Sequence, residues 1–154
     1  MARTPITLLK TAVRIAQESP VQRIARMQRG STTRDLQSLA RCLGLDTKEI
    51  HRMLGIPRRR RGTDHAAGKH PVLSLGETER VVGLWQLIGQ IQAMATPSTP
   101  AHSSSVARGF GAWLASPAEI LGKPASHFLD TFEGRGLIHD HMQAVYGNTD
   151  FNRI

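Results

Sequence analysis

The chain has 154 residues and a formal net charge of +8, and its length fits one compact domain or two small ones. Its single cysteine, Cys42, excludes an internal disulfide framework and a four-cysteine zinc site, and it fits a reducing compartment. No apolar run approaches the roughly 18–20 residues that a membrane span needs, and no secretory signal pattern opens the chain, so we expect a cytoplasmic protein with no membrane contact.

Apolar residues at helical spacing predict a helix from Thr4 to Ser19. Pro20 interrupts that pattern, and the apolar stripe then continues to a stop at Gly30. This part of the chain is strongly basic: residues 1–62 contain most of the lysines and arginines and few acidic residues, whereas the remainder is close to neutral. A basic half of this kind attracts polyanions.

Two short helices with a glycine turn between them are predicted next. The first ends at Gly44, and the second begins with a capping box of Asp46 and Glu49 and ends before Gly55. Four arginines, Arg58 to Arg61, follow at once. This layout is typical of a helix-turn-helix, with the arginines where the element that enters the DNA groove would begin.

The arginine run indicates contact with nucleic acid, because the planar guanidinium group binds phosphate oxygens and guanine edges through paired hydrogen bonds. Aromatic residues make up only 5% of the chain and do not alternate with the basic ones, which favours duplex DNA over a stacked single strand. A solvated basic loop is the alternative. We predict a DNA-binding region over residues 1–73, with these contact residues: Arg52, Arg58, Arg59, Arg60 and Arg61.

The strongest helical pattern covers residues 74–95 and begins with a capping box of Ser74 and Glu77. Its apolar residues cover so wide an arc that the helix is expected either between two layers or in a dimer seam. We therefore expect a connecting or dimerisation helix here and predict a homodimer, whose two-fold symmetry would also match a palindromic operator.

The remaining chain is predicted to be helical after a linker. Pro and Ser residues predict that linker over 96–105, and a domain with helical spacing is predicted over 106–154. Its helices are expected to break at Gly134 and Gly136 and to stop at Gly147, which leaves residues 148–154 as a tail. Because no segment alternates convincingly as a strand does, the predicted fold class is all-α.

The residues of an enzyme active site do not assemble in this sequence. His139 and His141 are two positions apart and point in different directions on a helix, so a metal site would need them to converge with His127 in the fold. Cys42 falls on an apolar helix face, which predicts a core residue rather than a nucleophile. We predict no enzyme activity, no cofactor and no metal; a metal-dependent enzyme remains an alternative only if the three histidines meet.

The C-terminal half carries a recognisable pattern. Residues 112–122 read Ala-Trp-Leu-Ala-Ser-Pro-Ala-Glu-Ile-Leu-Gly, and they are followed by Pro124, by Phe128-Leu-Asp-Thr131 and by a closing Tyr146-Gly147. This pattern resembles the toxin-binding domain of the Xre/MbcA/ParS antitoxins. The segment Leu75–Val81 also resembles the acidic-then-arginine helix start of that family.

The resemblance implies a type II antitoxin with an Xre-like helix-turn-helix that binds operator DNA and regulates its own operon. It also implies that residues 106–154 neutralise a RES-domain toxin, which attacks NAD by hydrolysis or by ADP-ribosyl transfer, and that the chain end reaches toward the toxin's active site. The implied toxin contacts are Trp113, Leu114, Leu121, Leu129, Tyr146, Gly147, Asn148, Asp150 and Phe151.

Two alternatives stay open at this point. Trp113 also fits the role of a core anchor in its own domain. The whole chain also fits a solitary helix-turn-helix transcription regulator whose C-terminal domain serves only oligomerisation. A neighbouring reading frame for a RES-type toxin would separate an antitoxin from such a regulator.

Overall fold

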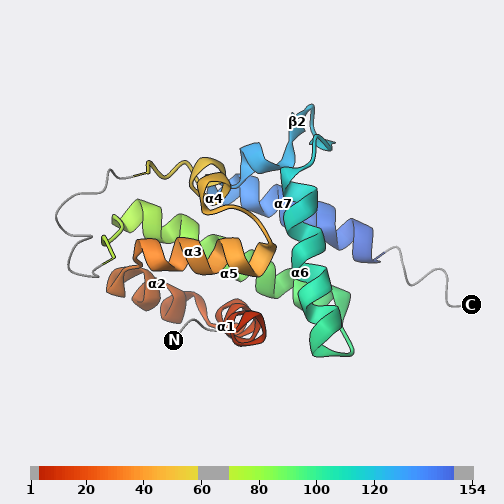
Figure 1. Cartoon of the computed structure of the whole chain (residues 1–154), viewed down its shortest axis with the longest axis horizontal. Helices are drawn as coiled ribbons and strands as arrows, with labels where there is room; N and C mark the ends of the chain where they lie inside the picture. The colour runs from red at the N-terminus through yellow and green to blue at the C-terminus, as the bar shows by residue number, and fades with distance from the viewer. Residues whose placement is uncertain (1–3, 59–69, 148–154) are drawn as a thin grey trace, which may run out of the picture.

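The computed structural model describes residues 4–58 and 70–147, and these residues form a mostly helical molecule (Figure 1). The predicted all-α fold is confirmed, with one short antiparallel strand pair added to it. In chain order the elements are α1 (Pro5–Gln17), α2 (Pro20–Arg29), α3 (Thr33–Leu43), α4 (Thr47–Met53), α5 (Leu75–Ala95), α6 (Pro100–Ala115), β1 (Glu119–Ile120), β2 (Lys123–Pro124), the 3-10 helix η2 (Ala125–Phe128) and α7 (Phe132–Gly147).

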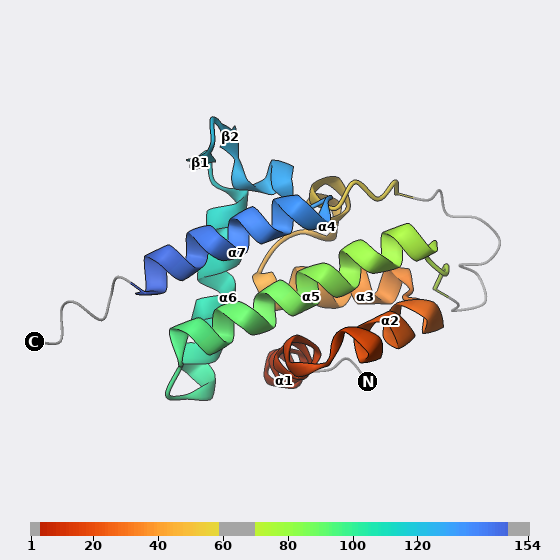
Figure 2. The ribbon, with the colours of Figure 1, turned by 180° about the vertical axis from the view of Figure 1, so that it is seen from behind.

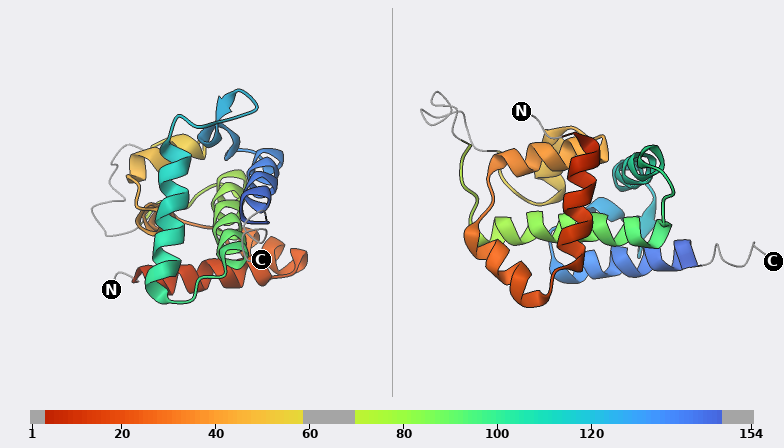
Figure 3. Two further views of the ribbon diagram at one scale, coloured as in Figure 1. Left: turned by 90° about the vertical axis from the view of Figure 1, so that its right-hand side faces the viewer. Right: turned by 90° about the horizontal axis from the view of Figure 1, so that it is seen from below.

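α5 is the central element of the fold. It contacts α1, α2, α6 and α7, and Figures 2 and 3 show these helices arranged around it. Of the two alternatives for this helix, burial between layers is therefore confirmed. Because other helices of the same chain cover its wide apolar arc, that arc is no longer an argument for a dimer interface. The apolar residues of its central part are all at most 5% exposed: Val81, Val82, Leu84, Trp85, Leu87, Ile88 and Ile91.

Of the two capping boxes predicted for α4 and α5, only the one at the start of α5 is present. Ser74 and Glu77 form the predicted capping box, in which each backbone N–H donates to the other residue's side chain, at 2.8 and 3.2 Å. The predicted box of Asp46 and Glu49 is wrong, because the Asp46 side chain makes no cap bond to α4. The backbone carbonyl of Asp46 accepts from the Glu49 N–H instead, at 3.0 Å.

Two prolines begin helices, and the interruption predicted at Pro20 is confirmed because α1 ends at Gln17. Pro20 lies in the first turn of α2, so it starts a helix of its own. Pro100 likewise lies in the first turn of α6, where the Thr99 hydroxyl accepts from the His102 N–H at 3.1 Å. The linker predicted over 96–105 is therefore wrong beyond residue 99. The Pro- and Ser-rich composition suggested a linker, but proline favours a helix when it occupies the first helical position.

α7 passes without a break through Gly134 and Gly136, so the breaks predicted there are wrong. The helix is stabilised by tertiary packing, since Ile138 and Met142 are buried in the core. Packing of this kind overrides the weak helical propensity of glycine.

One hydrophobic core extends from α1 to α7, and it contains buried residues of every α-helix except α2. The boundaries predicted after residues 73 and 105 therefore do not coincide with a break in packing. The separate functions assigned to residues 1–73 and 106–154 remain predictions. None of the helices within residues 4–58 and 70–147 combines the length and apolar character that crossing a bilayer requires.

The close crossing of α1 over α5 is testable at Gly89, where an added Cβ would overlap the carbonyl oxygen of Ala12. We expect Gly89→Ala to lower the free energy of unfolding by about 1–3 kcal/mol, the usual cost of overpacking, in urea denaturation. Gly109 on α6 is the matched control, because a Cβ there meets nothing within 4 Å. Gly109→Ala should stabilise the chain by about 0.5–1 kcal/mol. Equal effects of the two substitutions would contradict the close crossing.

Candidate functional site

The first candidate surface is formed by α3 and α4, which are joined through residues 44–46. Leucines on the inner side of α3 are buried, and Gly44 ends the helix with a φ of +68°, a conformation that glycine adopts without strain. α4 buries Ile50 and Met53 against the same core. Two short helices held at a fixed angle in this way have the outline of a helix-turn-helix.

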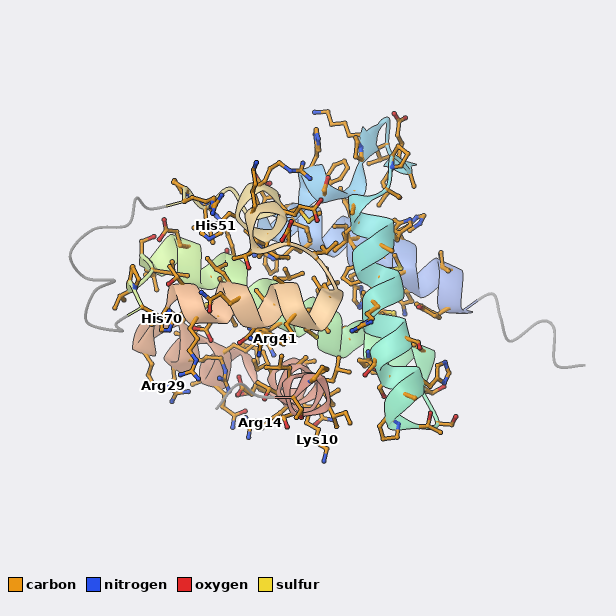
Figure 4. All side chains as sticks on the ribbon, viewed as in Figure 1. Lys10, Arg14, Arg29, Arg41, His51 and His70 are labelled. Atoms are coloured by element: carbon orange, nitrogen blue, oxygen red, sulfur yellow. The ribbon has the colours of Figure 1, made fainter. Side chains whose placement is uncertain are left out.

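Four basic side chains lie on the outer side of these two helices. Arg34 and Arg41 are exposed on α3 two turns apart, and Lys48 and Arg52 are exposed on α4 one turn apart. Residues at these spacings share one side of a helix. We call these four residues the basic face. Figure 4 shows Arg41 on the side of the molecule that also carries Lys10 and Arg14 of α1 and Arg29 of α2.

The structure places only part of the predicted DNA-contact set. Arg52 and Arg58 are exposed, as a contact residue must be. Arg59, Arg60 and Arg61 lie outside the described residues. Arg34, Arg41 and Lys48 are not in the predicted set, and their spacing opposite the buried leucines of α3 and Ile50 of α4 was the sequence signal for a basic face.

Two of the predicted toxin contacts are wrong, because Leu114 and Leu129 are core residues with no exposed surface. Leu114 lies on the side of α6 that also buries Ala107 and Phe110. Leu129 is buried where η2 leads into α7, and its carbonyl accepts from Arg135 Nη1 at 3.0 Å. Neither side chain is able to touch a partner without unfolding of this region.

Trp113 is a packing residue that joins α6 to α7. Its ring stacks on His141, with ring centroids 5.3 Å apart and an interplanar angle of 10°, and it also stacks on Phe110 at 6.1 Å. Trp113 and His141 therefore pack against each other, and because Trp113 is only partly buried, its toxin contact stays a prediction. His139 contacts its neighbour Asp140 at 3.1 Å. In the described part of the chain, no three metal-ligating side chains come together.

Cys42 is a core residue, as its place on an apolar helix face predicted. It is 3% exposed, and burial raises the pKa of its thiol to about 12. A thiol with so high a pKa supplies almost no thiolate near neutral pH, so it does not serve as a nucleophile in the folded chain.

Leu121 lies in a strained position at the tip of the β1–β2 hairpin. It is 77% exposed and has a φ of +50°, and the following Gly122 has a φ of +77°. Positive φ at both turn residues is typical of hairpins that favour Asn-Gly, and leucine is unfavourable there. An apolar side chain is thus held in water at a conformational cost, a combination that points to a contact outside the chain.

The C-terminal part of the predicted toxin surface is only partly described. Tyr146 is half-buried on α7 and packs against the core, and Gly147 is the last residue of that helix. Asn148, Asp150 and Phe151 lie outside the described residues.

A polar cluster connects the first surface to the C-terminal helices. Arg80 Nη1 of α5 donates to the carbonyls of Leu54 and Gly55 after α4, at 3.2 and 3.0 Å. The neighbouring Glu79 pairs with Arg135 of α7, and burial lowers the pKa of that guanidinium. These bonds join the residues that follow α4 to α5, and they join α5 to α7.

The chain is similar to a Prs ADP-ribosylating antitoxin of Sphingobium sp. (strain YBL2). The two sequences are 30% identical over 122 residues, which cover 78% of this chain and 75% of the relative. No protein-family model matches the chain, and no solved structure matches it.

The strain at Leu121 is testable without any partner. We expect Leu121→Asn to raise the free energy of unfolding by about 1 kcal/mol, because asparagine tolerates the left-handed conformation that leucine does not. Leu121→Ala is the control, since it removes the exposed side chain and keeps the unfavourable φ, and it should change stability little. Chemical denaturation of both variants decides the matter, and a Leu121→Asn protein no more stable than Leu121→Ala would exclude strain at this turn.

Proposed function

This chain belongs to the antitoxins of the ParS/MbcA type, and from that premise we propose that it neutralises a RES-domain toxin by direct binding and represses its own operon by binding DNA. An antitoxin acts by binding its partner and is not an enzyme. The observation that carries the proposal is the 30% identity over 78% of the chain to an antitoxin.

The relative's name supports one of the two reactions attributed to toxins of the RES class. That protein is called a Prs ADP-ribosylating antitoxin, which couples its role to ADP-ribosylation. ADP-ribosyl transfer from NAD is accordingly the reaction that we propose for the toxin of this chain, and NAD hydrolysis is the second candidate.

The toxin contact that we propose includes the β1–β2 hairpin and the end of α7. Leu121 supports it, because burial of this side chain against a toxin would offset the cost of its exposure. Leu114 and Leu129 contribute only by holding the scaffold. The tail residues Asn148, Asp150 and Phe151 remain part of the proposed contact.

The DNA contact that we propose is the basic face together with the arginine run. Within the basic face, Arg34, Arg41, Lys48 and Arg52 project from two adjacent helices. Side chains of this kind bind phosphate oxygens and set the orientation of a protein on duplex DNA. Arg58 and the three arginines that follow it would extend this contact.

Toxin neutralisation is tested by co-expression with the RES-domain protein that we expect beside this gene. The wild-type chain should restore growth and the cellular NAD level. Leu121→Asn and a chain ending at Gly147 should each bind the toxin more weakly, the truncation by about thirtyfold if one aromatic anchor worth about 2 kcal/mol is lost.

Leu75→Ala is the matched control for Leu121, because Leu75 is also exposed, at 64%, and lies at the start of α5. It should bind the toxin as the wild type does. A wild-type chain that binds operator DNA but neither binds nor neutralises the toxin would favour a solitary transcription regulator.

Operator binding is tested with the double variant Lys48→Ala/Arg52→Ala. If both side chains contact phosphates, the slope of log affinity against log salt should flatten by about 2, since each phosphate contact contributes roughly 0.9. Lys123→Ala is the control, because Lys123 is exposed on β2 and lies outside the basic face. Mobility-shift titrations measure the slope. If the wild type, the double variant and Lys123→Ala all give the same slope, the basic face is not part of the DNA interface.

A further inference from the structure

α2 is a ten-residue helix in which no residue is buried. A helix of this length is marginal on its own and normally depends on packing of an apolar side. The outer apolar residues of α2 are instead open to solvent, with Val21 75% and Ile24 53% exposed. Its inner side contacts α5, and Met27 is partly buried against the core. α2 thus offers an apolar surface that the chain itself does not cover.

Part of that surface, with Ile24 but not Val21, forms one wall of a groove. Figure 2 shows α5 running between α2 and α7. Residues of these three helices line an open groove with a volume of about 470 Å³. α5 supplies the floor with Gln86 and Gln90, whose amides are able to donate to and accept from a peptide backbone. α7 supplies the other wall with Phe132, which is 75% exposed.

The charge of the groove favours an acidic partner. α2 carries Arg23, Arg26 and Arg29 and no acidic residue. Arg26 is paired with Glu18, whereas Arg23 lines the groove and donates to the backbone carbonyl of Glu18, a bond that does not neutralise its charge. The one carboxylate in the lining, Glu79, is already paired with Arg135. A second copy of the chain docked on this groove by two-fold symmetry would bring Arg23 and its counterpart into one interface. Duplex DNA would meet an exposed phenylalanine and an isoleucine there.

We infer that this groove docks a segment of the toxin that presents an apolar side chain next to a carboxylate. The apolar side chain would lie between Ile24 and Phe132, and the carboxylate would face Arg23. The inference rests on the proposed function, because it takes the toxin as the partner. It adds a contact surface to the hairpin and the chain end.

Gly136 allows the groove to be blocked without disturbing the fold. It lines the α7 wall, and a Cβ at this position meets nothing within 4 Å. Gly83 lines the same groove but does not allow this test, because a Cβ there would overlap the guanidinium of Arg135. A glutamine at 136 would project into open space and favour the helix.

The experiment measures the affinity of Gly136→Gln and Phe132→Ala for a purified, catalytically inactive form of the RES-domain toxin that we expect beside this gene. Both variants should bind at least about tenfold more weakly than the wild type, as expected for loss of an interface anchor. Arg23→Gln should weaken binding and reduce its dependence on salt. The matched controls are Gly109→Gln, at an open helical position outside the groove, and Leu75→Ala, and both should bind as the wild type does. Thermal unfolding should show Gly136→Gln to be at least as stable as the wild type.

Wild-type affinity in both groove variants overturns the inference and leaves the proposed function standing. Unchanged toxin affinity with altered self-association in sedimentation assigns the groove to a second copy and also overturns it. A wild-type chain that does not bind the toxin at all overturns the proposed function, and the inference with it.

Discussion

Water must be excluded from several sides of α5 at once, and the arrangement of the other helices follows from that requirement. α1 crosses closely enough for the carbonyl of Ala12 to occupy the space where a Cβ of Gly89 would be. α6 and α7 cover further sides of the helix, and α2 leaves the groove open beside it. α3 of the basic face contacts α5 directly, Arg80 of α5 bonds the carbonyls that follow α4, and the hairpin follows α6, so both surfaces are positioned relative to α5.

Near its N-terminal end, α5 is held to its neighbours by charged side chains rather than by apolar burial. Glu79 and Arg80 are adjacent in sequence, and they bind in different directions, to Arg135 of α7 and to the carbonyls after α4. Arg135 is 5% exposed, and a buried guanidinium without a partner would be costly. The ion pair and the Leu129 carbonyl supply its partners, so this corner of the fold depends on all of its members.

The sequence was sufficient for structure that is decided locally. Helical spacing and the Ser74–Glu77 capping box predicted α5 nearly to the residue, and Gly44 marked the end of α3. The segment around Pro100 was predicted to be a linker because proline, serine and threonine are common both in linkers and in the first turn of a helix. Leu114 and Leu129 were assigned to the toxin surface because a family pattern combines residues that fold the domain with residues that touch a partner. Only the packing of α6, η2 and α7 separates the two kinds.

A single continuous core has a consequence for turnover of the protein in the cell. We expect a chain of this size with one core to unfold as a unit, without a stable intermediate that keeps α3 and α4 folded after α6 and α7 have opened. Proteases that act on the open chain consequently remove both surfaces in the same event. We therefore expect the basic face and the hairpin to share the lifetime of the whole fold, so that a destabilising substitution in the core shortens both.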